Sequence, residues 1–202
     1  MGGSYPAAMV CDVSDTRPSA SADLAATVVF AAFIAVLGVF PGINVGGSGV
    51  PIVLQNIGPV LAACLLGARR GTAAVALFLA LAALGLPLLA GGRGGVAPFV
   101  GPSGGFLFGY VLSAIVAGLI IARGRRAGLP ILLLAAAAGV ASSYVIGVPW
   151  LGLYTGDMAA AFTQSLVFVP GDAIKVVGAA LVASVVHRAL PGRLAVRPAA
   201  RS

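Results

Sequence analysis

The chain has 202 residues, of which 60% are hydrophobic and 8% are charged, and its mean hydropathy is +1.10. Soluble domains carry about 25% charged residues, so this composition excludes a soluble globular domain and indicates an integral membrane protein. The net charge of +7 comes from arginines between or after apolar runs, with no basic stripe interleaved with aromatic residues, so we expect no nucleic-acid partner.

The two ends of the chain are predicted to be tails around one membrane domain, residues 24–190. Residues 1–23 are polar, and the apolar run after them is too long for the core of a signal peptide, so we expect a disordered tail. Residues 191–202 form a basic C-terminal tail. Cys11 and Cys64 have no CxxC partner, so neither a disulfide framework nor a metal site is indicated.

Six apolar runs predict six transmembrane helices, because a span needs about 20 mostly apolar residues. The predicted fold is therefore an all-α integral membrane protein that crosses the lipid bilayer six times. The predicted spans are residues 24–41, 50–67, 72–90, 106–122, 129–150 and 168–190.

The first two spans carry features that favour contacts between helices. Ala31 and Ala35 have the small-xxx-small spacing that permits close helix–helix approach, although abundant alanine explains the spacing equally well. The second span contains Gln55 and Asn56. Amides at membrane depth find a partner in a neighbouring helix or line a cavity, and both interpretations stay open here. The link 68–71, ARRG, is expected to turn the chain around.

The longest interior loop, residues 91–105, reads GGRGGVAPFVGPSGG. Its glycines allow the backbone to approach a ligand closely, or they simply make a flexible surface loop. Arg93 is the only charged residue in this loop and is a candidate contact for an anion.

The fifth span ends in aromatic residues, Tyr144, Trp150 and Tyr154. Belts of Tyr and Trp are typical of the membrane interface, and this interpretation is favoured over stacking on a ligand.

The sixth span opens with LVFVPGDAIKVV, in which Asp172 and Lys175 lie three residues apart. Lys175 is the only lysine in the chain, and residues at i and i+3 share one helix face. Ionisable groups inside a span are expensive and usually face a cavity or a partner, so this pair is the main candidate for a binding site. The alternative is that Asp172 caps the helix and Lys175 pairs with it.

The distribution of arginine predicts the orientation in the membrane. Six spans place both termini on one side, together with the Arg-rich links 68–71 and 123–128. By the positive-inside rule this side is cytoplasmic. The glycine-rich loops, Gln55 and the Asp172/Lys175 pair then converge on one outward-facing region, which we expect to be a binding site.

One motif suggests an enzyme. GPSGG at residues 101–105 matches the GxSG pattern of rhomboid-type intramembrane serine proteases, and His187 lies in the last span. At 1.5 Å per residue the predicted depths of Ser103 and His187 differ by roughly 20 Å, whereas a nucleophile and its base need a separation of about 3 Å. A protease is therefore disfavoured. The chain also lacks the P-loop pattern GxxxxGK[ST], so active transport would need a partner or an ion gradient.

Five segments together resemble the BioY family over residues 24–190. VPIVLQNIG, LLGARRG, LGLPLLAGGRGG, GPSGGFLFGY and FVPGDAIK occur in the order and spacing of that family. Val53 replaces the usual threonine of VPITLQ, and GPSGGF replaces GPTGGY.

The resemblance implies the six-helix fold of a substrate-binding (S) component of an energy-coupling-factor (ECF) transporter, with both termini cytoplasmic. It implies high-affinity biotin binding and uptake across the bacterial cell membrane, no enzymatic activity and no cofactor, with biotin as the transported substrate. An S component for a different vitamin is the alternative. The implied partners are a transmembrane energising subunit, docked on Ala31 and Ala35, and two ATPase subunits.

The resemblance also implies which residues meet biotin. It assigns Asp172 and Lys175 to the ligand, and it implicates the loop at residues 91–95, including Gly91 and Gly92. We expect Asp172 to accept from the ureido N–H groups and Arg93 to meet the carboxylate. Gln55 and Trp150 complete the predicted ligand-binding set.

Overall fold

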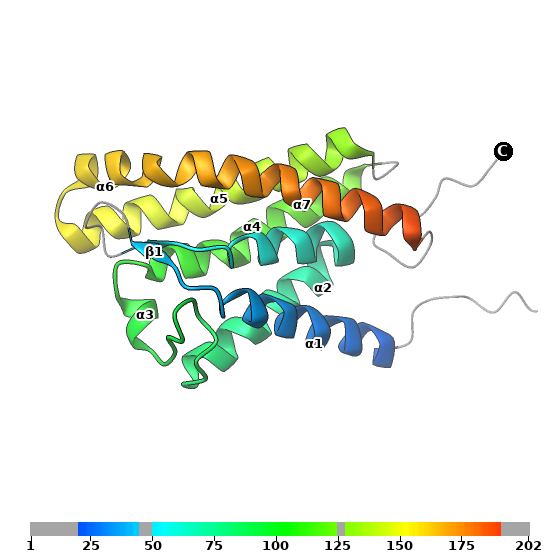
Figure 1. Ribbon diagram of the computed structural model, residues 1–202, viewed down its shortest axis with the longest axis horizontal. Coiled ribbons are helices and arrows are strands. Elements are labelled where there is room, and N and C mark those ends of the chain that lie inside the picture. The colour runs from blue at the N-terminus through cyan, green and yellow to red at the C-terminus, as the bar shows by residue number, and fades with distance from the viewer. Residues whose placement is uncertain (1–19, 45–49, 125–127, 191–202) are drawn as a thin grey trace, which may run out of the picture.

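The computed structural model describes residues 20–44, 50–124 and 128–190, and these parts are almost entirely helical (Figure 1). The start of the first helix and the end of the last lie at the same end of the bundle. The N-terminal tail up to residue 19, with Cys11, and the C-terminal tail 191–202 lie outside the described residues.

Five helical stretches are long and apolar enough to cross a membrane within the described parts of the chain. They are α1 (Ala20–Leu37), α2 (Ile57–Ala83), α4 (Gly104–Arg123), α5 (Leu129–Thr155) and the stretch formed by α6 (Met158–Ser165), a 3-10 turn (Leu166–Phe168) and α7 (Val169–Ala189). The remaining elements are short: α3 (Ala97–Val100) and the antiparallel strands β1 (Ile43–Asn44) and β2 (Pro51–Ile52).

The second and third of the six predicted spans both fall in α2, which is two helical limbs joined by a sharp bend at Gly67. Gly67 has φ 82° and ψ 177°, a conformation that residues with a Cβ rarely adopt. Just after the bend Gly71 packs on Ala63, and a Cβ at Gly71 would lie 2.7 Å from the Ala63 Cα. The limbs 57–66 and 68–83 therefore fold back on each other, which confirms the predicted reversal between the second and third spans (Figure 1).

The second and third predicted spans are too long at their ends away from the Gly67 bend. The second span was expected to start at residue 50, but residues 50–56 form β2 and a turn, and helix begins at Ile57. Pro51 explains part of this difference, because a proline pushes the preceding residue toward extended backbone. The third span was expected to reach residue 90, but α2 ends at Ala83, and residues 84–96 form a loop.

Other boundaries extend beyond the prediction. α1 begins at Ala20, inside the predicted tail 1–23. α5 continues past Trp150 to Thr155, although it contains Pro149. The last helical stretch begins at Met158, ten residues earlier than expected. Asp157 starts this stretch, because its side chain accepts a hydrogen bond from the Ala160 N–H, the usual capping arrangement.

The core holds mainly small residues, which bring the helices close together. α1 packs against α2, with Ala31 only 4% exposed and Ile34 fully buried. Ala35 is partly buried against the same core. The close approach that the Ala31/Ala35 spacing permits is therefore made to the chain's own helices. The outer faces of the bundle carry exposed valine and leucine, as expected of a surface that meets lipid.

The two ends of the bundle differ in charge and in backbone. The start of α1, the bend of α2, the ends of α4 and α7 and the start of α5 lie at one end (Figure 1). Arg69, Arg70, Arg123 and Arg188 occur at these positions, and Arg70 pairs with Asp23 at 2.8 Å. By the positive-inside rule this end faces the cytoplasm. The opposite end contains the mostly irregular backbone of residues 38–44, 50–56 and 84–103.

Candidate functional site

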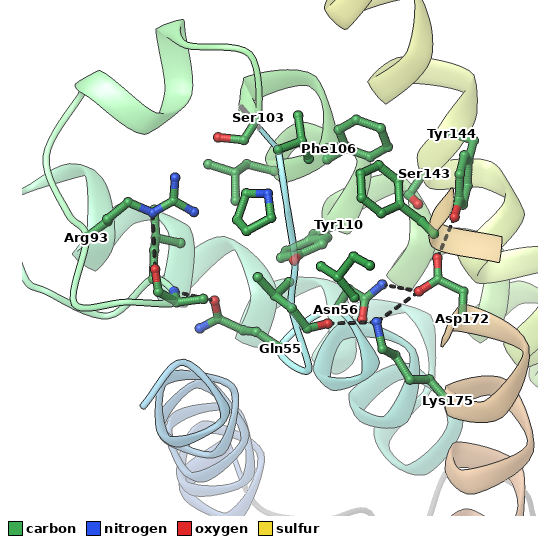
Figure 2. Close-up of a pocket in the computed structure, with 18 residues that line it drawn as sticks. Gln55, Asn56, Arg93, Ser103, Phe106, Tyr110, Ser143, Tyr144, Asp172 and Lys175 are labelled. Carbon is green, nitrogen blue, oxygen red and sulfur yellow. Dashed lines mark hydrogen bonds and ion pairs between the residues drawn. The ribbon is translucent and has the colours of Figure 1, made fainter. Parts of the chain in front are cut away.

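A pocket opens among the irregular segments at the non-cytoplasmic end, as expected from the sequence (Figure 2). Its wall comes from the segment 50–56, the loop 84–96, and helices α4, α5 and α7. The polar lining side chains are Gln55, Asn56, Arg93, Ser103, Tyr110, Ser143, Tyr144, Asp172 and Lys175, and the apolar lining residues are Val50, Pro51, Ile52, Val53, Leu89, Ala90, Phe106, Leu107 and Phe168.

Asp172 is the centre of a buried polar group that we call the Asp172 cluster, made of Asn56, Tyr144, Asp172 and Lys175. Asp172 is 6% exposed. Oδ1 accepts from Lys175 Nζ at 3.0 Å and from Asn56 Nδ2 at 2.9 Å, and Oδ2 accepts from the Tyr144 hydroxyl at 2.6 Å. A charged group removed from water needs such partners, and three donors from three elements hold the Asp172 side chain in position.

Lys175 joins α7 to the segment that leads into α2. Its ammonium donates to Asp172 and also to the Val53 carbonyl at 2.7 Å. The predicted pairing of residues 172 and 175 on one face is therefore confirmed. The alternative that Asp172 acts as the helix cap is wrong, because its hydrogen bonds are made to side chains and the residue before α7, Phe168, makes no capping bond.

The Asp172 cluster retains free hydrogen-bonding capacity. An ammonium has three donors, and Lys175 uses two of them within the described residues. Asn56 Oδ1 is buried and has no partner among these residues. A buried acceptor without a donor costs free energy, which a ligand N–H group at this position would recover.

Arg93 lies on the opposite side of the pocket from Asp172 (Figure 2). Residues Leu89 and Arg93 exchange backbone hydrogen bonds of 2.9 and 3.1 Å, which close a tight turn. Gly91 and Gly92 form this turn with φ of 78° and 71°. Arg93 Nε donates to the Ala90 carbonyl at 3.1 Å, and the rest of the half-buried guanidinium points into the pocket.

Gln55 is 2% exposed, and its amide binds backbone groups. Nε2 donates to the Ile34 carbonyl at 2.9 Å and to the Leu88 carbonyl at 2.8 Å. Oε1 accepts from the Ala90 N–H at 3.2 Å. The sequence left open whether this amide finds a partner in a neighbouring element or lines a cavity. The hydrogen bonds support a partner in neighbouring elements, and Gln55 also borders the pocket.

Three of the predicted ligand-binding residues do not line the pocket. Gly91 and Gly92 are exposed and shape the turn that carries Arg93. Trp150 packs beside Phe108, and its Nε1 donates to the Gly101 carbonyl at 2.9 Å, so it supports the loop before α4.

The serine and histidine of the protease interpretation are engaged separately. Ser103 donates to the Pro98 carbonyl at 3.3 Å beside the pocket. His187 lies near the cytoplasmic end of α7, where its Nε2 contacts the Cys64 carbonyl at 3.0 Å. They form no nucleophile–base pair, because each is hydrogen-bonded within a different part of the fold.

Comparison with known sequences places the chain in a family. The sequence model of the BioY family matches residues 12–192. The chain is 41% identical over 177 residues to "Biotin transporter BioY" of Rhizobium etli, and 44% identical over 183 residues to the protein of the same name from Rhodobacter capsulatus. Each alignment covers 84% of this chain and 95% of the relative. The chain belongs to the BioY family.

This BioY-family chain also resembles a solved structure. The crystal structure at 2.1 Å of the S-component for biotin from an ECF-type ABC transporter superposes with a TM-score of 0.75. The two chains are 35% identical, and the match covers 82% of this chain and 90% of the other. The predicted S-component fold in a multi-pass membrane protein is thereby confirmed.

Sequence reasoning missed the contacts that reach Asp172 from other elements. Tyr144 was assigned to an aromatic belt, yet it donates to Asp172 and packs edge-on against Phe106, with ring centroids 5.9 Å apart. Phe168 also packs edge-on against Phe106, with ring centroids 6.0 Å apart, and the three rings form an aromatic wall. Asn56 was noticed as an amide at membrane depth but was not included in the predicted site.

Proposed function

We propose that this BioY-family protein binds biotin in the pocket and carries it into the cell as the substrate-binding component of an ECF-type transporter. The proposal rests on the relatives named biotin transporter BioY and on the likeness to an S-component for biotin. In this function the protein is a transport component rather than an enzyme. Biotin is its substrate, and no cofactor is needed.

The observation that carries the proposal is that the Asp172 cluster and Arg93 lie on opposite sides of a pocket that also has an apolar wall. Biotin has a ureido ring with two N–H donors and a carbonyl, an apolar body, and a carboxylate tail. Asn56 Oδ1 and the Asp172 carboxylate supply acceptors for the N–H groups, and Lys175 supplies a donor for the ureido oxygen. Buried sites with unpaired polar groups discriminate strongly against ligands that cannot pair them.

The apolar body and the tail of biotin meet the rest of the pocket. Phe106, Tyr110 and Phe168 provide flat apolar surface between the two polar sites. The Arg93 guanidinium faces the carboxylate, and it is suited to that contact because its fork of N–H groups matches the two carboxylate oxygens.

The proposed partners supply the energy. The proposed assembly has a transmembrane energising subunit and two ATPase subunits, since this sequence has no P-loop. Docking of the energising subunit on Ala31 and Ala35 stays a prediction, and the outward face of α1 offers the exposed residues Val28, Val29 and Val36 instead.

The experiment is a calorimetric titration of the purified full-length protein in detergent with biotin and, separately, with other water-soluble vitamins. We expect tight one-to-one binding of biotin and no heat from the others. Binding of a different vitamin in place of biotin would assign the same pocket to another substrate. The absence of any binding by folded protein would contradict the proposal.

A further inference from the structure

Gln55 links two segments beside the pocket, the end of α1 and the loop 84–96. It joins the end of α1, through the Ile34 carbonyl, to the loop 84–96, through Leu88 and Ala90. Both amide N–H groups and one acceptor position are used in these bonds, so the amide has no N–H left for a ligand. A direct ligand contact from Gln55 would have to break this connection.

The bond to Ile34 replaces one that α1 lacks. The last carbonyls of a helix have no partner within it and need one from elsewhere. Gly38 N–H donates to Ala35 rather than to Ile34, and the Gln55 side chain takes the Ile34 carbonyl instead. The end of α1 and the amide of Gln55 therefore stabilise each other in a site where water is excluded.

The hydrogen bonds between Gln55 and the loop 84–96 are linked to Arg93 through Ala90. The Ala90 N–H donates to Gln55, and the Ala90 carbonyl accepts from Arg93 Nε. Next to Ala90, Leu89 exchanges two backbone hydrogen bonds with Arg93. Fixing residues 88–90 thus fixes both the backbone and the side chain of Arg93.

Gly38 shows how closely α1 and the loop approach each other. A Cβ at Gly38 would lie 2.3 Å from the Leu88 carbonyl oxygen and 2.6 Å from Gln55 Nε2. No side chain fits there without moving the loop or the amide. Adding a side chain at Gly38 is therefore a second way to disturb the contact between α1 and the loop, and it leaves Gln55 in place.

We infer that Gln55 is a positioning residue, which sets Arg93 for the ligand carboxylate by binding the loop 84–96 to the end of α1. The inference rests on the proposed function, because it concerns how the biotin pocket holds its cationic side. It assigns Gln55 a role in affinity for the carboxylate and none in recognition of the ureido ring.

The first test compares biotin with biotin amide, which lacks the negative charge. In Gln55→Met the side-chain length is kept and the three hydrogen bonds are lost. We expect biotin to bind about fivefold more weakly while biotin amide changes by less than twofold, the same pattern as in Arg93→Gln. In the double variant Gln55→Met with Arg93→Gln the two losses of affinity should not add, because residues that act through one another are coupled.

The control is Ser165→Ala, which removes another buried and hydrogen-bonded side chain outside the pocket lining. This variant should bind biotin as the unmodified protein does.

The second test needs no ligand. Hydrogen exchange measured by mass spectrometry should be faster over residues 84–93 in both Gln55→Met and Gly38→Ala, and unchanged over the middle of α5. Gly38→Ala also replaces Gln55→Met in the binding test if the latter does not fold. If the unmodified protein fails to bind biotin, the proposed function falls and the exchange result still decides the role of Gln55.

Two results would overturn the inference. Equal weakening of biotin and biotin amide in Gln55→Met would mean that the side chain serves the ureido end or the pocket as a whole. Unchanged exchange over residues 84–93 in both variants would mean that Gln55 does not hold the loop.

Discussion

The two polar sides of the pocket are built in different ways. The Asp172 cluster is held by side chains from α5, α7 and the segment before α2, so its geometry follows from how the helices pack. Arg93 is carried by a loop, and backbone hydrogen bonds set its position. Under the proposed function, the rigid side would meet the fixed ureido ring and the loop side would meet the flexible charged tail.

Removing the carboxylate of Asp172 should have the largest effect. In Asp172→Asn the ligand loses its charged acceptor, and Lys175 remains buried without a counter-charge, which is strongly unfavourable. We expect biotin affinity to fall by about 100-fold or more, measured by calorimetry.

Misfolding of the variant is the competing explanation for such a loss, and a second variant separates the two. Asp172→Asn combined with Lys175→Met removes both charges and should recover the stability of the unmodified protein without recovering binding. Unchanged affinity in Asp172→Asn would show that the cluster does not meet the ligand.

Loss of one donor to Asp172 should have a smaller effect. Tyr144→Phe keeps the ring contact with Phe106 but removes the 2.6 Å hydrogen bond to Oδ2. Hydrogen bonds to charged groups are worth enough that we expect affinity to drop about tenfold. Tyr154→Phe, at a tyrosine that is 57% exposed near the end of α5, should leave binding unchanged. Equal effects of the two changes would argue against a specific role for Tyr144.

Neutralising Arg93, on the loop side, should weaken binding less than the changes above. The size of the loss should depend on whether the ligand has a carboxylate. Arg93 is half-buried, so screening by water limits the strength of its contact. We expect Arg93→Gln to weaken biotin about fivefold, as judged by equilibrium titration at low salt, and to leave biotin amide nearly unaffected. A loss of the same size with biotin amide would place Arg93 at another part of the ligand.

The smallest effect is expected at Ser103, which borders the pocket but uses its hydroxyl within the loop before α4. Ser103→Ala should change biotin affinity by less than twofold in the same titration. A loss above about tenfold would add Ser103 to the binding residues and would weaken the distinction between the two sides.

The sequence predicted the helical framework and the main charged pair for clear physical reasons. Hydropathy locates apolar runs, arginine sets their direction, and a lone Asp/Lys pair at i and i+3 can only share a face. The location of Arg93 in a glycine-rich outer loop was also predicted. The ligand roles of these residues stay predictions that the binding measurements will decide.

The remaining features depend on contacts between distant segments. Residues 50–56 are apolar enough to resemble a span, because hydropathy does not separate helix from extended backbone that lines a cavity. Tyr144 lies 28 residues from Asp172 in sequence, and only the packing of α5 against α7 brings them together. Likewise, nothing in the spacing of Ala31 and Ala35 reveals whether that face turns inward.

The bend at Gly67 gives a measure of how far the pocket lies from the cytoplasmic end. The limb 57–66 rises about 15 Å from that bend to Asn56, at 1.5 Å per residue. The hydrocarbon layer of a membrane is about 30 Å thick. A molecule held against Asn56 would therefore lie one short limb from the bend, a distance along that limb of about half the hydrocarbon thickness.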